Sequence, residues 1–134
     1  MRFPSAEWAA AFRAALEQNE EYRQAAAAWV GDILLRVAPA APEAPAPGIH
    51  LVLAHGACSV AEFHADARAV ASEFVYEGTA ENWQRLLRGE LDPVQAILGR
   101  AFRIRGNLLK ASRFTRAAKA LVETAASVPA DSVG

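Results

Sequence analysis

The spacing of apolar residues along the chain predicts helical structure first and strands next. Trp8, Phe12 and Leu16 recur at the helical interval of four residues, and Ser5 ahead of them is a typical helix-capping residue. The pattern then falters and resumes over residues 20–28. We therefore expect the start of the chain to be helical.

From Trp29 the pattern changes to the two-residue alternation of strands. Four strands are predicted, over residues 29–37, 49–54, 58–66 and 69–77. The second and third flank Gly56, which permits the positive φ of a tight hairpin turn. Residues 39–48 contain four prolines and no large apolar side chain, so we expect an exposed loop there.

Glycines separate the short elements of the second half. A helix with an apolar side ends at Gly89, a shorter helix is predicted over residues 94–98, and a strand over residues 100–106. A long closing helix is predicted from residue 108 to about residue 126, and residues 127–134 are expected to form a flexible tail.

This order of elements defines the expected fold class. Helical structure leads into three strands, a connection reaches a fourth strand, and helices, a fifth strand and a closing helix follow. We therefore expect one α+β domain over residues 1–134, with a mixed sheet of about five strands and helices packed on one face.

Composition narrows the class of protein further. The chain has 134 residues, 53% of them apolar and 22% charged, which is sufficient for a folded core. Its single cysteine, Cys58, excludes an internal disulfide. No apolar run reaches the length of a bilayer span, and the start lacks the pattern of a signal peptide. We expect a soluble cytoplasmic protein, and the excess of arginine over lysine is typical of a bacterial source.

Charge is distributed unevenly along the chain. Residues 1–92 carry a net charge of −6, residues 93–122 carry +7 with no acidic residue, and residues 123–134 carry −2. The positive segment is a candidate contact for an anionic partner, although pairing within the chain or simple solvation is the alternative. Nucleic acid is disfavoured, because Phe102 and Phe114 lie on the apolar sides of their predicted elements and offer no stacking platform.

Motifs for catalysis or cofactor binding are not found in the sequence. Its glycines lack the spacing of a phosphate-binding loop, and no serine lies in a GxSxG motif. The nearest approach to a metal site is His50 and His64, which a hairpin brings together with Glu62. A shift of one residue in register separates the two histidines, so ordinary sheet positions are the alternative. We expect no enzymatic activity, no cofactor and no metal.

The segment ENWQRLLRGELDPVQAILGRAFRIRGNLLKASRF, residues 81–114, resembles the sterol-carrier-protein-2 family of nonspecific lipid-binding domains. The shared features are a Leu-Asx-Pro turn at Leu91, Asp92 and Pro93, and a basic alternating strand followed by Gly106 and Asn107. Arginine stands in this strand where lysine is more typical, Asn107 stands where aspartate is frequent, and the proline-rich loop is longer than usual.

The resemblance implies a helix-covered sheet that encloses an apolar tunnel for a fatty acyl, sterol-like or isoprenoid ligand. The apolar faces supply candidate ligand-binding residues: Phe74, Trp83, Leu87, Leu98, Phe102, Ile104, Phe114 and Leu121. For each of them, an ordinary core position is the alternative. Candidates for transient docking to an anionic membrane surface are Arg103, Arg105, Lys110, Arg113 and Arg116.

Two other functions remain open at this level. An accessory domain that presents a hydrophobic metabolite to a partner enzyme would share the same tunnel. A small metal-dependent enzyme would use the region of His50 and His64. The pattern of residues predicts neither the ligand nor the oligomeric state.

Overall fold

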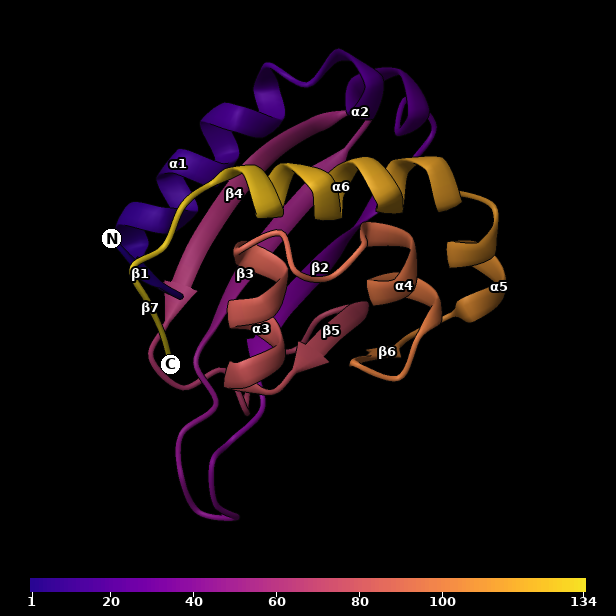
Figure 1. Ribbon diagram of the computed structural model, residues 1–134. Coiled ribbons are helices and arrows are strands. Elements are labelled where there is room, and N and C mark those ends of the chain that lie inside the picture. The colour runs from indigo at the N-terminus through magenta and orange to yellow at the C-terminus, as the bar shows by residue number, and fades with distance from the viewer.

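The computed structural model describes all 134 residues apart from the side chains of Pro93 and Ile97. The elements in chain order are β1 (Arg2–Phe3), α1 (Ala6–Glu17), α2 (Glu20–Ala25), β2 (Val30–Val37), β3 (Gly48–Ala54), β4 (Ala57–His64), β5 (Phe74–Gly78), α3 (Ala80–Leu87), α4 (Pro93–Leu98), β6 (Phe102–Arg105), α5 (Leu108–Ser112), α6 (Thr115–Ser127) and β7 (Ser132–Val133). The central sheet has the strand order β4-β3-β2-β5-β6, and helix α6 crosses above it (Figure 1).

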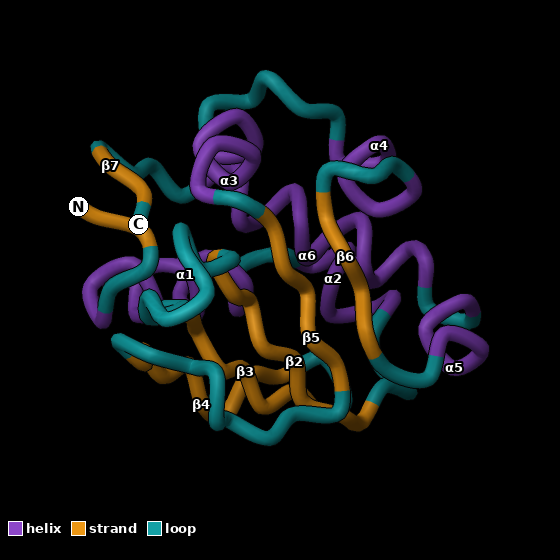
Figure 2. The backbone as a smooth tube through the Cα atoms, turned by 90° about the horizontal axis from the view of Figure 1, so that it is seen from below, coloured by secondary structure: helices purple, strands orange, loops and turns teal.

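The sheet is mixed, because β2 and β5 are parallel while the other neighbouring pairs are antiparallel. Helices cover one face of the sheet, as Figure 2 shows from below. The expected α+β fold with a mixed five-stranded sheet and helices on one face is therefore confirmed. The proline-rich segment between β2 and β3 protrudes from the body of the molecule (Figure 1).

The face of the sheet beneath the helices is apolar because alternate residues of each strand point to it. Leu35 in β2 lies opposite Ile49 in β3 and Tyr76 in β5, and all three are buried. Across β6 the same layer continues with Ile104 opposite Tyr76. The alternation of residues along each strand thus makes this face of the sheet continuously apolar, and the helices bury it.

An aromatic cluster closes one end of this layer. Trp83 on α3 is 1% exposed, and its ring centroid lies 4.7 Å from that of Phe3 and 4.9 Å from that of Phe102. Its indole N–H donates to the Arg36 carbonyl oxygen at 3.0 Å. The rings of Tyr76 and Phe102 stack at 4.7 Å beside it. Trp83 therefore joins α3, the sheet and the N-terminal strand.

The loop from β4 to β5 covers the opposite face of the sheet, as Figure 2 shows below the strands. Ala67 in this loop and Leu34 in β2 are both fully buried. A Cβ atom on Gly48 would lie 2.7 Å from the Leu35 carbonyl oxygen and 3.2 Å from the Ala67 methyl group. Only a glycine leaves room for this close approach.

Asp32 in β2 holds the end of the β4–β5 loop against the sheet by a hydrogen bond. Its carboxylate accepts hydrogen bonds from the Glu73 backbone N–H at 3.0 Å and from His50 Nε2 at 2.7 Å. Burial acts to raise the pKa of Asp32, but the hydrogen bonds from His50 and Glu73 outweigh it and hold the pKa below its usual value. The charged form of Asp32 is therefore the form that stabilises the fold.

We expect Asp32→Asn to lower the free energy of unfolding by about 1–2 kcal/mol at neutral pH. A lowered native pKa contributes stability above the unfolded pKa of about 4, and the contribution is lost as pH falls through the native value. The difference between wild type and variant should therefore shrink in acid. Urea unfolding at neutral pH and near pH 3 measures both effects. Glu62→Gln, at an exposed position, is the matched control, and an equal loss in both variants would contradict this role.

Three features of the structure differ from the sequence predictions. The predicted strand over residues 69–77 begins only at Phe74. The final helix is interrupted at Phe114, whose φ of −127° and ψ of 36° are not helical, so α5 and α6 are separate. The predicted flexible tail instead carries β7, which pairs in parallel with β1. The backbone N–H of Asp131 also donates to the Met1 carbonyl oxygen at 2.7 Å.

Candidate ligand cavity

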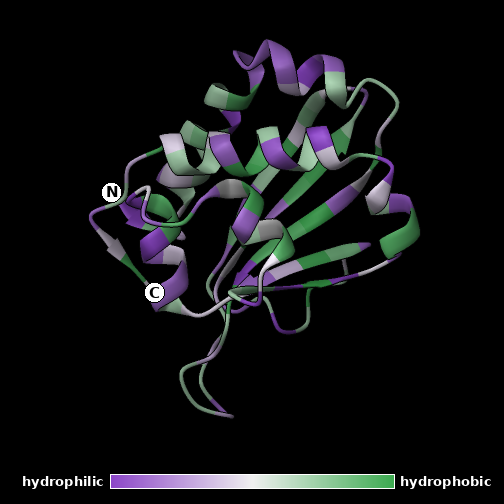
Figure 3. Cartoon of the chain, turned by 45° about the vertical axis from the view of Figure 1, so that its right-hand side comes forward, coloured by the Kyte–Doolittle hydropathy of each residue, from purple (hydrophilic) through white to green (hydrophobic). Residues whose placement is uncertain are grey.

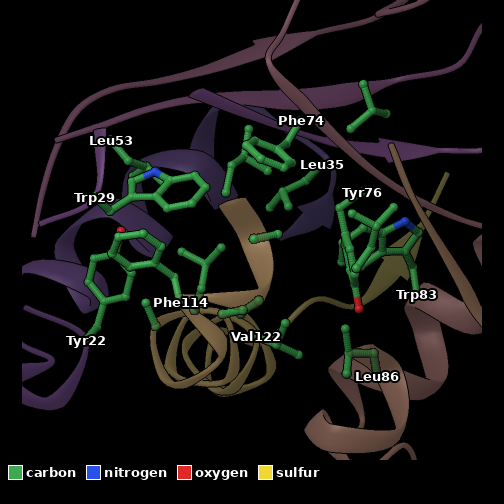
Figure 4. A pocket seen from close by; sticks show the side chains of 18 residues that line it. Tyr22, Trp29, Leu35, Leu53, Phe74, Tyr76, Trp83, Leu86, Phe114 and Val122 are labelled. Atoms are coloured by element: carbon green, nitrogen blue, oxygen red, sulfur yellow. The ribbon is translucent and has the colours of Figure 1, made fainter. Parts of the chain in front are cut away.

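An apolar cavity of about 100 Å³ lies between the sheet and the helices. Figure 4 shows the side chains of its lining. They come from β2, β3, β5, β6 and from α2, α3, α5 and α6, and comprise Tyr22, Trp29, Ile33, Leu35, Leu53, Phe74, Val75, Tyr76, Trp83, Leu86, Ile104, Ala111, Phe114, Ala117, Ala118, Leu121, Val122 and Ala125. Among the described residues, none that lines the cavity carries a formal charge at neutral pH.

The cavity is hollow because α6 turns small side chains toward the sheet. Ala117, Ala118 and Ala125 line it together with Leu121 and Val122, at the spacing of one helix face. The sheet supplies large side chains below them, including Phe74 and Tyr76. Alanine side chains do not reach far enough to fill the space between the two layers, and the void remains.

Aromatic rings close the cavity at the end near α2. The ring centroid of Trp29 lies 5.0 Å from that of Phe114 and 5.3 Å from that of Phe74. The break between α5 and α6 places Phe114 in this cluster. Lys110 covers the outside, with Nζ 4.7 Å from the Trp29 ring centroid and 2.6 Å from the Val30 carbonyl oxygen.

Tyr22 and Tyr76 are the only ionisable residues in the described part of the lining. Tyr76 donates its hydroxyl to the Ala96 carbonyl oxygen at 3.1 Å. Tyr22 is 2% exposed, and its hydroxyl has no hydrogen-bond partner among the residues that the structure describes. Burial raises the pKa of both hydroxyls well above the usual value for tyrosine, so both are neutral. Tyr22 thus contributes a neutral hydroxyl that forms no hydrogen bond to the described residues.

The partly exposed lining residues indicate where the cavity meets solvent. Most of the lining is buried, but six lining residues keep intermediate exposure: Ile33, Val75, Ile104, Ala111, Phe114 and Ala118. The last four belong to one stretch of the chain, which runs from β6 through α5 into α6. We therefore place the opening between β6, α5 and α6.

The structure distributes the eight predicted pocket residues over three environments. Five line the cavity: Phe74, Trp83, Ile104, Phe114 and Leu121. Leu87 and Phe102 are buried outside the lining, where Phe102 stacks on Tyr76. Leu98 is 76% exposed at the end of α4.

Sequence reasoning missed Tyr22, Trp29 and the alanines of α6. Tyr76 was recoverable, since it shares a strand face with Phe74. The alanines share the apolar stripe of the closing helix, but their place in the cavity wall, like that of Tyr22 and Trp29, depends on how α2 and α6 cross the sheet.

The two histidines considered for metal binding lie on the other face of the sheet. His50 is opposite Glu62 rather than His64, because the turn lies at His55 and Gly56 and the bulge between Val52 and Leu53 shifts the register by only one residue. The two imidazole centroids are 6.5 Å apart, and His50 is hydrogen-bonded to Asp32. Within the described residues, no group of three or more His, Cys, Asp or Glu side chains is arranged to hold a metal ion.

The basic segment divides into one paired and several unpaired cations. Lys110 forms an ion pair with Glu73 at 2.5 Å, so it faces the protein. The others are exposed and have no carboxylate partner among the described residues: Arg100, Arg103, Arg105, Arg113, Arg116 and Lys119. Pairing within the described part of the chain therefore accounts for only one of the seven positive charges.

The fold and the cavity together define a class of protein, an α+β domain with an apolar chamber beneath its helices. The model of the SCP-2 sterol transfer family matches residues 12–119, and the chain belongs to this family. A search of curated proteins found no match. None of the described helices has the length and apolar character needed to cross a bilayer.

Solved structures agree with the family assignment. A crystal structure of sterol carrier protein 2 is 31% identical, with a TM-score of 0.82 over 92% of this chain and 97% of that chain. A solution structure from Thermus thermophilus, described as a conserved hypothetical protein and possibly a sterol carrier protein, is also 31% identical, with a TM-score of 0.78 over 94% of this chain and 89% of that chain. The sterol carrier protein domain 2 of Helicoverpa armigera is 16% identical over 90% of this chain and 87% of that chain, and its TM-score of 0.53 shows the fold alone.

Proposed function

We propose that this protein is a cytoplasmic carrier that holds a lipid in its apolar cavity and transfers it without chemical change. The observation that carries the proposal is the cavity itself, with 18 lining residues and no charged side chain. A catalytic role finds no support in the lining, because its only ionisable groups are two neutral phenols. Family membership supports the same function.

The energetics suit a carrier rather than a permanent store. Moving an acyl chain from water into an apolar site gains about 0.8 kcal/mol per methylene group. The interior of a bilayer is equally apolar, so exchange between membrane and cavity changes the free energy little. Such a balance allows both uptake and release.

The size of the cavity implies that it widens when a ligand enters. Pockets that bind small molecules usually have volumes of roughly 300–1,000 Å³, whereas this cavity has about 100 Å³. The short helix α5 has no buried residue and lies at the opening, so its displacement would enlarge the space at the loss of the contacts of Lys110 with Glu73 and Val30.

The direct test is native mass spectrometry of the gently purified protein, together with titration of a fluorescent fatty acid. We expect a bound lipid of defined mass, or saturable binding that an unlabelled fatty acid, sterol or isoprenoid alcohol displaces. If none of these ligands binds, the proposal is wrong and the cavity is a packing defect.

The ligand's polar end is proposed to lie at Tyr22. The Tyr22 side chain lines the cavity with Trp29 and Phe114 at one end (Figure 4), and its hydroxyl has no hydrogen-bond partner among the described residues. No cation lines the cavity, so a carboxylate buried there would lack a partner of opposite charge. A neutral polar end, such as an alcohol or an ester, is the better match.

We expect Tyr22→Phe to weaken binding of a long-chain alcohol about fivefold, since one hydrogen bond contributes about 1 kcal/mol. Binding of a purely apolar probe should not change. Competition titrations with both probes measure the difference.

Tyr76→Phe is the matched control for this prediction. Its hydroxyl already bonds to Ala96, so its loss should lower stability without distinguishing the two probes. Equal behaviour of the two probes in Tyr22→Phe would remove Tyr22 from the ligand site.

A further inference from the structure

The short helix α5 presents two large apolar side chains to solvent. Leu108 is 60% exposed and Leu109 is 68% exposed, and the helix contains no buried residue. It lies beside β6 at the edge of the molecule (Figure 2). Exposed leucines on adjacent positions are unusual on a surface that meets only water.

Other residues of the same segment reach the cavity. Ala111 in α5 and Phe114 immediately after it are lining residues with intermediate exposure. The segment is therefore a thin partition between the lipid chamber and the surrounding solvent. A surface that binds Leu108 and Leu109 therefore lies next to the opening of the cavity.

Exposed cations flank these leucines in the sequence. Arg105 precedes α5, and Arg113 and Arg116 follow the leucines, with no carboxylate partner among the described residues. Figure 3 shows the adjacent apolar and polar colouring on this side of the molecule. Apolar side chains beside basic ones are the combination that binds at the interface of an anionic bilayer.

We propose that the protein docks on an anionic phospholipid bilayer through α5, with Leu108 and Leu109 in the acyl boundary and Arg105, Arg113 and Arg116 on lipid phosphates. In this orientation the opening of the cavity faces the bilayer that supplies the lipid. This inference rests on the proposed carrier function for its purpose, but its contacts lie outside the cavity. Charge complementarity favours the bilayer over a second copy of the chain, since two basic surfaces repel each other.

Sedimentation with vesicles of phosphatidylcholine, with and without phosphatidylglycerol, tests the docking. We expect binding only to the anionic vesicles, and weaker binding as salt is raised. Leu108→Gln with Leu109→Gln should reduce the partition coefficient at least about tenfold. Arg113→Gln with Arg116→Gln should reduce it about 25-fold, since each basic residue near the membrane contributes about fivefold.

The matched control is Arg85→Gln with Arg88→Gln, which removes two exposed charges on and after α3. It should retain most of the binding, whereas an equal loss would indicate attraction by net charge without a specific surface. Unchanged vesicle binding in the double leucine variant would overturn the proposal. A fall in native mass from dimer to monomer in that variant, with no vesicle binding by wild type, would assign the surface to a second copy.

Ligand titration separates this inference from the carrier function. Every variant above leaves the lining side chains unchanged, so binding of the fluorescent fatty acid in solution should persist. Intact ligand binding with no vesicle binding would reject the docking surface alone. Loss of ligand binding in the wild type would reject the carrier function instead.

Discussion

Ala118→Trp is expected to reduce binding of a fluorescent fatty acid at least about tenfold, with the fold retained. Ala118 lines the cavity from α6 and keeps intermediate exposure at the opening. An indole at this position enters a space of about 100 Å³ and removes the volume that an acyl chain needs. Overpacking costs about 1–3 kcal/mol in a filled core, but an existing void reduces that cost here.

Binding titration and thermal unfolding of the same variant measure the two effects separately. Thr115→Trp is the matched control, because it adds the same side chain at an exposed position of α6 outside the lining. We expect normal binding in the control. Full binding by Ala118→Trp would place the ligand elsewhere and contradict the assignment of this cavity.

Trp83→Ala is expected to lower the free energy of unfolding by about 3–5 kcal/mol, a large part of the stability of a domain of this size. The indole is 1% exposed and packs against three aromatic rings, those of Phe3, Tyr76 and Phe102. Its removal leaves a void at the end of the cavity. It also leaves the Arg36 carbonyl oxygen without its 3.0 Å donor.

Urea unfolding of Trp83→Ala and Leu98→Ala compares a buried with an exposed apolar residue. Leu98 was predicted with Trp83 as a pocket residue, but it is 76% exposed. Its substitution should change stability by less than about 0.5 kcal/mol. Comparable losses in the two variants would show that the aromatic cluster around Trp83 does not hold α3 against the sheet.

Local patterns predicted the boundaries of most elements correctly. The cap predicted at Ser5 forms the expected side-chain hydrogen bond to a backbone N–H group, and Thr79 and Asp92 cap α3 and α4 in the same way. These features depend on residues close in the chain, so they are accessible from sequence. The strand faces were also predictable, because the alternation of apolar and polar residues determines which side is buried.

Long-range features escaped prediction for a physical reason. The pairing of β1 with β7 joins residues about 130 positions apart, and two-residue strands carry no periodic signal. The break at Phe114 satisfies a contact with Trp29, which lies in a different part of the chain. The ion pair of Lys110 with Glu73 likewise removes one cation from the basic surface only after folding.

The sequence by itself determined the α+β class, the apolar faces of sheet and helices, and the resemblance to a lipid-carrier family, because each depends on local periodicity or on an ordered motif. Only the tertiary structure decided that the space between α6 and the sheet is hollow and that Tyr22 stands in its wall. Whether apolar side chains fill a gap depends on the distance between two layers, and packing across the whole domain sets that distance.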